Sequence, residues 1–385
     1  MKTNTPKLRF KEFTDEWQEK KLGEIVDFKN GKAHEQDIVE SGKYIVLNSK
    51  FISTEGKIKK FTDKQTCPVR HNDIVMVMSD IPNGKAIAKC FYIDANDKYT
   101  LNQRICSLTA GSSYEPRFLI RKINRNRYYL KFDDGVSQTN LKKDDVLNLP
   151  LLTPQKPEQQ KIADFLTAVD DKVQKLEEKK KAFEKYKKGI MQAIFSQKIR
   201  FKPDGKLARR SLGEVGYPDW EEKRFDDALI SLPTKSHQIL NSQFSKQGKF
   251  PVVDQGQQKI AGYSDDSSHL FSNVPVIVFG DHTTFLKYVD FNFIVGADGT
   301  KLLHSKNGDN LKFLYYELEQ NKLTPEGYKR HFSVLKMLKL TIPVIEEQEK
   351  IAEFLTALDD KINLINNQLE QSKFFKKSLL QRMFV

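Results

Sequence analysis

One fifteen-residue segment occurs twice in this chain, and this repeat constrains the fold more than any other feature. Residues 158–172 read EQQKIADFLTAVDDK, and residues 347–361 read EQEKIAEFLTALDDK. The second copy begins 189 residues after the first (347 − 158 = 189), and the correspondence continues without a gap to the end of the chain. A repeat of this kind predicts two copies of one structural unit.

Both copies have the heptad pattern of a coiled coil, because apolar residues occupy its a and d positions over four heptads. Neither segment contains Pro, so each is predicted to form one helix of about 55 Å at 1.5 Å per residue. A seam of that length requires an equally long partner, and we expect the two helices to pack antiparallel against each other. The seam residues are Leu166, Val169, Val173, Leu176, Phe183, Ile190, Leu355, Leu358, Ile362, Ile365, Leu369 and Leu379.

Some positions of the two helices are polar or charged. Seam positions Lys180, Lys187, Ser372 and Lys376 could fix the register, or this part of the coil could be frayed or covered by another subunit. The pairs Asp170-Asp171 and Asp359-Asp360 fall at e and f positions, where they are expected to face solvent or a docked subunit. The lysines that begin at Lys179 are expected on a solvated face, with DNA phosphate or an acidic partner as alternatives.

The duplication extends beyond the helices. Arg9 lies in a Leu-Arg-Phe segment and Arg200 in a matching Ile-Arg-Phe segment. The only two tryptophans, Trp17 and Trp220, begin matched stretches, and an apolar-Pro pair precedes each long helix. The chain is therefore predicted to be a tandem of units 8–196 and 199–385, each a globular part followed by a long helix.

The globular parts are predicted to mix strands and helices, so the fold class is α+β. Apolar runs bounded by Gly, Asn and Asp predict strands, and a Pro at a first turn predicts the start of a helix. In the first part, strands are expected at 43–47, 73–78, 85–93 and 104–108, and a helix at 116–132. In the second part, strands are expected at 250–253, 274–279, 285–289, 291–295 and 301–304, and a helix at 310–320.

Composition favours a polyanionic partner. Lys and Arg exceed Asp and Glu by 13 in 385 residues, which is typical of proteins that bind nucleic acid. The three cysteines, Cys67, Cys90 and Cys106, are odd in number and widely spaced, which predicts reduced thiols. There is no apolar signal segment at the N-terminus and no long apolar run, so a cytoplasmic protein is expected.

On the paired helix motifs, the lead-ins at Pro150 and Pro343, and the openings at Trp17 and Trp220, the whole chain resembles the specificity subunit of type I restriction–modification enzymes. The resemblance implies target recognition domains at 1–150 and 199–343. It also implies a central conserved helix at 151–198 and a C-terminal helix at 344–385 that pairs with it. Each domain would bind one half of a bipartite DNA sequence, and the coiled coil would set the gap between the halves.

The resemblance also implies partners. Two methyltransferase subunits would dock on this framework and modify adenines, and two ATP-driven restriction subunits would join them. S-adenosylmethionine, Mg²⁺ and ATP would belong to those partners, and this chain would bind no cofactor and catalyse no reaction. The residues agree, since the sequence contains no GxxxxGK[ST] or GxGxxG phosphate-binding loop and no N/D-P-P-Y/F methyltransferase motif.

Candidate DNA-binding residues are polar side chains in loops between the predicted strands, where they could enter a groove. Residues 79–85 and 280–284 occupy corresponding places in the two parts. The candidates are Lys32, Ser79, Asn83, Lys85, Asn102, Gln103, Arg104, Gln138, Asn140, Thr234, Lys235, His237, Asp281, His282, Thr283, Thr284, Lys287, Lys329 and Arg330. Each of these residues alone is expected in a turn or at a phosphate more often than at a base, but several of the set are expected to contact DNA.

Two other classes of function are weighed against DNA recognition. A self-contained nuclease or methyltransferase lacks support, because the nucleotide and metal motifs are missing. A pure interaction protein, such as a decoy that engages a restriction complex, is the second alternative. The net charge of +13 argues against a decoy that mimics DNA, which would be acidic.

Overall fold

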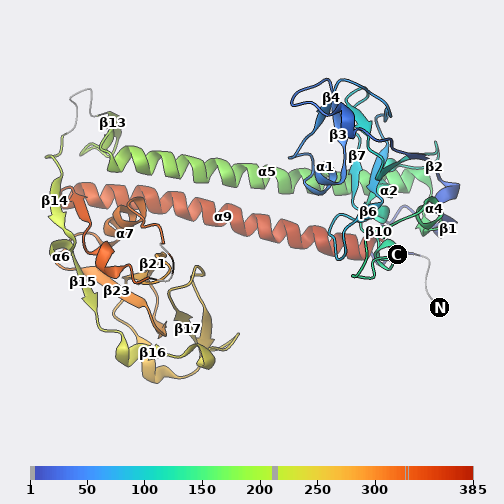
Figure 1. The fold of residues 1–385 in the computed structure, drawn as a ribbon. Helices are drawn as coiled ribbons and strands as arrows, with labels where there is room; N and C mark the ends of the chain where they lie inside the picture. The colour runs from blue at the N-terminus through green and yellow to red at the C-terminus, as the bar shows by residue number, and fades with distance from the viewer. Residues whose placement is uncertain (1–4, 210–215, 326, 328, 385) are drawn as a thin grey trace. The chain divides into compact units, whose positions relative to one another are not determined.

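The structure, a computed structural model, describes residues 5–209, 216–325, 327 and 329–384. The chain forms two compact units, Met1–Lys175 with Leu369–Val385, and Leu176–Gln368. Each unit contains one globular part and a portion of both long helices, α5 (Lys156–Phe195) and α9 (Ile345–Met383) (Figure 1). The two long helices predicted from the repeat are therefore present. Each of them belongs partly to one compact unit and partly to the other.

In the described residues, the first unit is built around one four-stranded and one three-stranded sheet. One has the strand order β2 (Val26–Asn30), β9 (Ile105–Ala110), β5 (Ile74–Val77), β7 (Cys90–Tyr92), and all its strands are antiparallel. The other has the order β4 (Phe61–Thr62), β3 (Tyr44–Leu47), β8 (Tyr99–Leu101), with β3 and β8 parallel. The short strands β1 (Gln18–Lys21) and β11 (Pro150–Thr153) pair next to the start of α5, and β6 (Ser79–Asp80) pairs with β10 (Thr139–Asn140).

The second unit repeats this topology with little shared sequence. Its antiparallel sheet has the order β15 (Leu229–Leu232), β23 (Thr300–Ser305), β20 (Val276–Gly280), β21 (Leu286–Val289). Its other sheet has the order β16 (Gln238–Ile239), β22 (Phe293–Gly296), β17 (Phe250–Val253), β18 (Gly262–Ser264), and β19 (Leu270–Phe271) also pairs with β22. Strands β17 and β22 are parallel, as β3 and β8 are. The predicted α+β fold with an internal repeat is thus confirmed.

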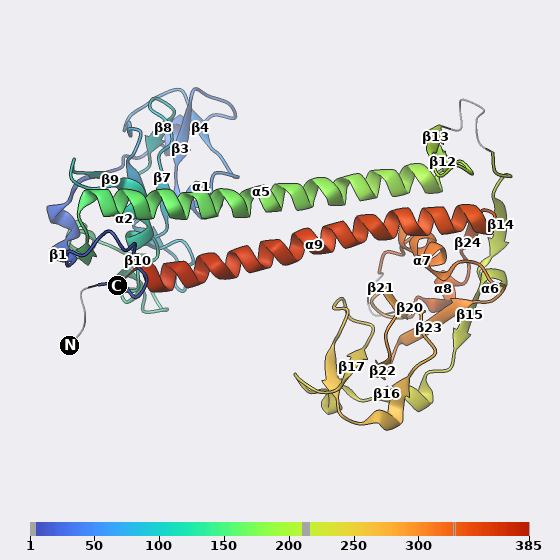
Figure 2. The same ribbon diagram turned by 180° about the vertical axis from the view of Figure 1, so that it is seen from behind.

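The remaining elements surround these sheets. In the second unit, β14 (Glu221–Arg224) pairs with β24 (Lys339–Ile342), and β12 (Ile199–Phe201) pairs with β13 (Leu207–Arg209). The principal short helices are α1 (Ser49–Ser53), α2 (Pro116–Ile123), α3 (Arg127–Leu130), α4 (Lys143–Leu147), α6 (Phe225–Ala228), α7 (Leu311–Gln320) and α8 (Phe332–Leu335). Helix α7 packs on the antiparallel sheet of its unit, and the start of α9 lies beside them (Figure 2).

Most predicted strands are confirmed, and two predicted elements are wrong in extent. The expected strand 85–93 is reduced to β7, because Asp80 accepts hydrogen bonds from the backbone amides of Ala86 (2.6 Å) and Ile87 (3.0 Å) and holds that segment as a turn. The expected helix 116–132 is two helices, because Arg125 has a left-handed backbone (φ 53°) and Asn126 caps α3.

The seam of the two long helices is present in each unit. In the first unit, Leu166 of α5 shares a core with Leu379 and Met383 from the end of α9. In the second unit, Ile194 near the end of α5 shares a core with Leu355 from the start of α9. Early residues of one helix therefore meet late residues of the other, so the pairing is antiparallel in both units. All twelve predicted seam residues are buried or half-buried.

The expectation that the paired aspartates of the long helices face solvent or a docked subunit is wrong for Asp170 and Asp359. Asp359 is half-buried and binds Lys187 at 2.6 Å, and Asp170 is half-buried and binds Lys376 at 2.6 Å. These aspartates do not simply face solvent, because each reaches a seam lysine of the opposite helix. Lys180 Nζ likewise donates to Asn366 Oδ1 at 2.7 Å. Three polar seam positions thus have partners across the seam, which fixes the register of the two helices.

Two further properties follow from the described residues. Cys67, Cys90 and Cys106 are free thiols, as their spacing predicts. Among the helices of the described ranges, none is both long and apolar enough to cross a lipid bilayer.

Candidate nucleic-acid interface

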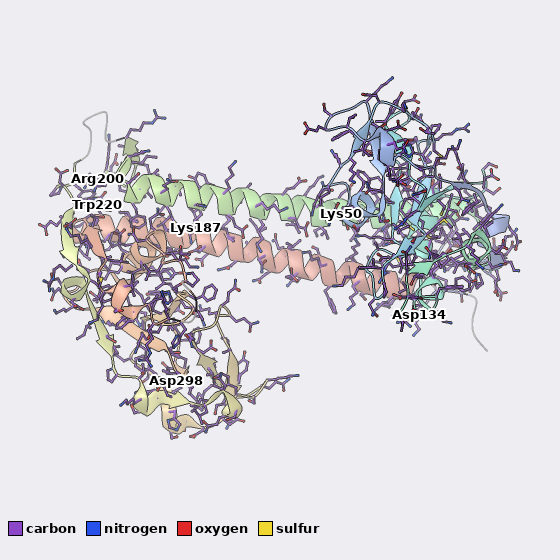
Figure 3. The ribbon with its side chains drawn as sticks, in the orientation of Figure 1. Lys50, Asp134, Lys187, Arg200, Trp220 and Asp298 are labelled. Atoms are coloured by element: carbon purple, nitrogen blue, oxygen red, sulfur yellow. The ribbon has the colours of Figure 1, made fainter. Side chains whose placement is uncertain are left out.

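The repeated Glu-Gln pair at the start of each long helix holds a globular part in place. Glu347 is fully buried and accepts hydrogen bonds from Arg200 (3.2 and 2.6 Å) and from the indole of Trp220 (3.1 Å). Figure 3 shows Arg200 and Trp220 next to each other at this point. Glu158 accepts the same set from Arg9 (2.7 and 2.7 Å) and Trp17 (3.3 Å). Burying these carboxylates is tolerated because each is paired with an arginine.

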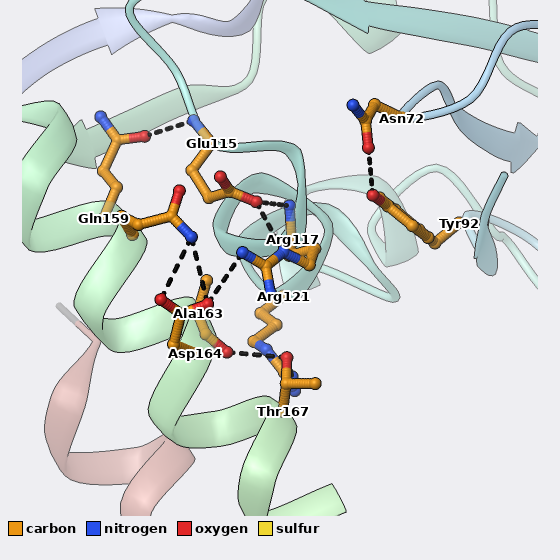
Figure 4. A network of polar contacts seen from close by, with 10 residues as sticks. Asn72, Tyr92, Glu115, Arg117, Arg121, Gln159, Ala163, Asp164 and Thr167 are labelled. Atoms are coloured by element: carbon orange, nitrogen blue, oxygen red, sulfur yellow. Dashed lines mark hydrogen bonds and ion pairs between the residues drawn. The ribbon is translucent and has the colours of Figure 1, made fainter. Parts of the chain in front are cut away.

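The glutamine of each pair binds the helix of the globular part. Gln159 accepts a hydrogen bond from the amide of Glu115, the N-cap of α2, at 2.9 Å (Figure 4). Gln348 accepts one from the amide of Asn310, the N-cap of α7, at 2.7 Å. Both side chains also donate to a Pro carbonyl, of Pro154 and Pro343, at 2.8 Å. The repeated motif therefore encodes the attachment of each part to its long helix.

In the first unit, three segments meet at the end of the central strand β5. The amide of Met78, the residue after β5, donates to the carbonyl of Arg104 at 2.9 Å. The amide of Leu141, which follows β10, donates to the carbonyl of Met78 at 2.8 Å. We call this pair of backbone hydrogen bonds the strand-end frame. It brings residues 78–79, 104 and 140–141 together.

The second unit has the same strand-end frame after its own central strand, β20. The amide of Asp281 donates to the carbonyl of Gly299 at 2.7 Å, and the amide of His331 donates to the carbonyl of Asp281 at 2.8 Å. Met78 therefore corresponds to Asp281, and the next residues along the two loops, Ser79 and His282, also correspond. By the same bonds Arg104 corresponds to Gly299, and Leu141 to His331.

Several candidate side chains of the first unit bind one another beside its frame. Gln138 donates to Ser79 Oγ at 2.7 Å and to Asn140 Oδ1 at 3.1 Å, and the Asn140 amide donates back to the Gln138 carbonyl at 3.3 Å. Asn83 donates to the carbonyl of Gly135 at 3.1 Å. The structure thus brings these four candidates to one edge of the unit, where Lys85 is also exposed.

A second group of candidates lies where the turn after β8 passes the segment after β2. Lys32 and Asn102 are paired by a parallel bridge. Asn102 Oδ1 accepts from the amide of Gln103 at 2.5 Å, and the Gln103 side chain donates to Glu35 at 3.1 Å. Arg104 follows directly, so the backbone connects this group to the strand-end frame. The Lys32 and Arg104 side chains are exposed.

In the second unit, the loop 281–284 is fastened to its neighbours. Asp281 accepts from the amide of Phe332 at 2.8 Å, and His282 Nδ1 lies 3.2 Å from the carbonyl of Lys329. Thr283 donates to the carbonyl of Gln255, whose side chain accepts from the amide of His282 at 3.1 Å. The loop therefore joins Lys329–His331 at one edge, as Ser79 joins Gln138 in the first unit.

Three candidates of the second unit are buried and support the site from inside. Asp281, Thr284 and Lys287 are 3%, 1% and 6% exposed. Lys287 Nζ donates to the carbonyl of Asp254 at 2.7 Å, and burial lowers the pKa of this lysine although Asp254 opposes that shift. These residues position the loop and do not reach its surface.

The candidates at 234–237 form a separate turn that leads into β16. Thr234 Oγ1 accepts from the Gln238 side chain at 3.2 Å, and the His237 ring packs edge-on against Phe271 at 5.2 Å. Lys235 is exposed. Strand β16 pairs with β22, and the chain continues from the end of β22 to Gly299 of the strand-end frame. The turn at 234–237 therefore adjoins the same sheet.

Sequence reasoning missed two residues that organise the frames, Asp80 and Gln255. Asp80 shapes the loop of the first unit, and Gln255 binds two segments of the second, residues 282–283 and the Asp298 carbonyl at 3.0 Å. Both are polar residues at or just beyond the end of an apolar strand, so their position in the sequence could have identified them. Within the described ranges, no cluster of three or more His, Cys, Asp and Glu could hold a metal ion.

Comparison with known proteins gives consistent results. A family model described as the type I restriction modification DNA specificity domain matches residues 14–184 and 217–372. The chain is 22% identical over 415 residues to a putative type I restriction enzyme MjaX specificity subunit of Methanocaldococcus jannaschii, covering 98% of this chain and 95% of that protein. The MjaVIII specificity subunit of the same organism is 22% identical over 404 residues, covering 95% and 91%.

A solved structure has the same fold. The crystal structure of a type I restriction–modification S subunit from M. genitalium has a TM-score of 0.69 to this chain at 17% identity, and 99% of each chain is covered. The likeness therefore extends over both globular parts and both long helices.

Proposed function

Because this chain belongs to the type I restriction modification DNA specificity domain family, we propose that it is the sequence-recognition subunit of such an enzyme. It performs no catalysis itself. The single observation that carries the proposal is that the family model matches the chain twice, once over each globular part with its helix. The net charge of +13 fits a phosphate-binding role.

Each globular part binds one half of a bipartite DNA site. This is supported by the two strand-end frames, which share their backbone hydrogen bonds and differ in their side chains. Two domains that recognise different DNA sequences require different side chains, and these can be placed on a common scaffold. The candidate residues from Lys32 to Arg330 that are exposed at these edges supply the DNA contacts.

The long helices set the gap between the two half-sites and hold the partner subunits. Support comes from the register contacts Lys180–Asn366, Lys187–Asp359 and Asp170–Lys376, since a gap of fixed length requires helices that cannot slide. Two methyltransferase subunits and two restriction subunits assemble on this chain in the cytoplasm. They supply the sites for S-adenosylmethionine, Mg²⁺ and ATP.

A methylome tests this function directly. The chain is co-expressed with its methyltransferase subunit in a host free of DNA methylation, and the modified adenines are sequenced. We expect a split motif with a fixed gap, modified on both strands. A short continuous motif, or the same modification without this chain, would show that the two parts are not paired DNA readers.

A further inference from the structure

We propose that Arg104 and Arg330 recognise guanine, one in each half of the DNA site. This inference rests on the proposed function, because it presupposes that both globular parts bind duplex DNA. It adds the identity of one specificity-determining residue in each part, and it predicts that each half-site contains a G·C pair.

Both arginines belong to the strand-end frames. The carbonyl of Arg104 accepts the hydrogen bond from Met78, and Arg330 directly precedes His331, whose amide donates to Asp281. Each arginine is therefore attached to a backbone segment that is fixed to the end of a central strand. A fixed backbone reduces the entropy lost when a long side chain is ordered on DNA.

In the first unit, the other polar side chains that could recognise a base are engaged internally. Ser79 and Asn140 both accept from Gln138, and Gln103 binds Glu35. The Asn102 oxygen and the Asn83 amide bind the backbone. Arg104 is exposed and, within the described residues, makes no hydrogen bond or ion pair through its guanidinium. It is thus the planar donor group that remains available at this edge.

In the second unit, most of the other polar candidates are also engaged or buried. His282 is directed to Lys329, Thr283 to Gln255, and Thr234 to Gln238. Asp281, Thr284 and Lys287 are buried. Arg330 is exposed, and its guanidinium also has no partner in the ranges that the structure describes.

The chemistry of the available groups distinguishes their roles. A guanidinium donates two parallel hydrogen bonds, which match the O6 and N7 acceptors of guanine in the major groove. The exposed lysines Lys32, Lys85 and Lys235 carry compact charges on flexible stems and suit phosphate oxygens. Arginine for guanine and lysine for phosphate is therefore the assignment that these side chains favour.

The two arginines occupy different positions of equivalent frames. Arg104 corresponds to Gly299, whereas Arg330 corresponds to Asn140, one residue before the frame amide. The guanidinium therefore comes from the strand-connecting turn in one part and from the segment before the short helix in the other. We expect the recognised G·C pair to lie at different distances from the gap in the two half-sites.

The test uses the full chain co-expressed with its methyltransferase subunit in a methylation-free host, with sequencing of modified adenines. Arg104→Ala should relax the requirement for one G·C pair in one half-site, with a loss of discrimination of about tenfold to a hundredfold. Arg330→Ala should do the same in the other half-site only. The unaffected half-site of each variant shows that the chain is folded and assembled.

Matched variants separate base recognition from charge. Arg127→Ala and Arg224→Ala remove exposed arginines outside the frames and should leave the motif unchanged. Arg104→Lys keeps the charge but loses the planar fork, so it should also relax the G·C position. Lys85→Ala should lower methylation at all sites alike and keep the motif.

Several results would overturn the assignment. They are a wild-type half-site without a G·C pair, an unchanged motif in either alanine variant, uniform loss of methylation with the motif retained, or full rescue by Arg104→Lys. The last two would make the arginines phosphate contacts. If the wild-type chain directs no split motif at all, the proposed function itself fails, which is a different result from any of these.

Discussion

Arg200 donates two hydrogen bonds to Glu347, at 3.2 and 2.6 Å, and both side chains are buried, with 1% and 0% exposed. The pair joins the strand that enters the second globular part to the first turns of α9. Arg9 and Glu158 repeat it in the first unit, although Arg9 is more exposed, at 14%. The two points where the globular parts are attached to the long helices are thus built from the same pair of residues.

Removing Arg200 should destabilise the second unit strongly. Arg200→Ala leaves the Glu347 carboxylate buried beside Trp220 without its cation, which costs about 3–5 kcal/mol. Denaturant unfolding of the full chain measures this loss. Arg9→Ala is the matched control and should cost less, because water can reach its site. Equal losses would mean that burial does not determine the strength of these pairs.

Asp359 should contribute to stability while its neighbour Asp360 does not. Asp359 binds both Lys187 (2.6 Å) and the Tyr316 hydroxyl (2.7 Å), whereas Asp360 is exposed. Asp359→Ala is expected to lower the free energy of unfolding by about 1–2 kcal/mol, and Asp360→Ala to change it by less than about 0.5 kcal/mol. Thermal unfolding of both variants tests this, and similar effects would exclude a register role for Asp359.

Glu317 should make the second unit less stable as pH rises. This residue is 2% exposed, and burial raises its pKa to about 7, above the ordinary glutamate value of 4.5. Between those values the folded chain binds more protons than the unfolded chain, so stability falls as pH rises from about 4.5 to 7 and is level beyond. The cost of ionisation is roughly 3 kcal/mol at most.

Glu317→Gln removes that cost and keeps an acceptor for Thr341, which donates to Glu317 Oε1 at 3.1 Å through its amide. The variant should therefore be more stable than the wild type at pH 8 and similar to it at pH 4.5. Chemical denaturation at the two pH values gives the difference. An advantage that does not grow with pH would contradict the origin assigned to it.

DNA binding should weaken steeply with salt, and single lysines should set part of the slope. Each phosphate contact contributes about −0.9 to the slope of log K against log salt on duplex DNA. Lys85→Ala and Lys235→Ala should each reduce the slope by about that amount. Lys206→Ala, in the exposed turn between β12 and β13, serves as the control and should leave the slope unchanged. Binding that is insensitive to salt would argue against phosphate contacts.

Exchange of the first globular part should change only half of the target. When residues 1–145 are replaced by the corresponding segment of another family member, the methylated motif should keep the half-site bound by the second part and keep the gap. The core around Leu166 and Leu379 belongs to the first unit, so the exchange must leave the helices intact. Changes in both half-sites would show that the two parts do not act independently.

The sequence by itself determined the features that depend on local periodicity and on repetition. The heptad pattern of residues 158–195 and 347–383 predicts α5 and α9, and the matched Trp17 and Trp220 mark where each globular part begins. These signals persist in the chain because a long helix needs a regular apolar seam whatever surrounds it. The alternation of strands and turns also located most strands of both parts.

Only the tertiary structure decided which polar side chains are available for DNA. Gln103 and Arg104 are adjacent and both polar in sequence, yet the Gln103 side chain binds Glu35, whereas the Arg104 guanidinium is exposed and has no partner in the described chain. The same holds for Asp359 and Asp360 on the long helix. A polar residue is engaged or available according to neighbours that come from distant segments, and no local pattern encodes those contacts.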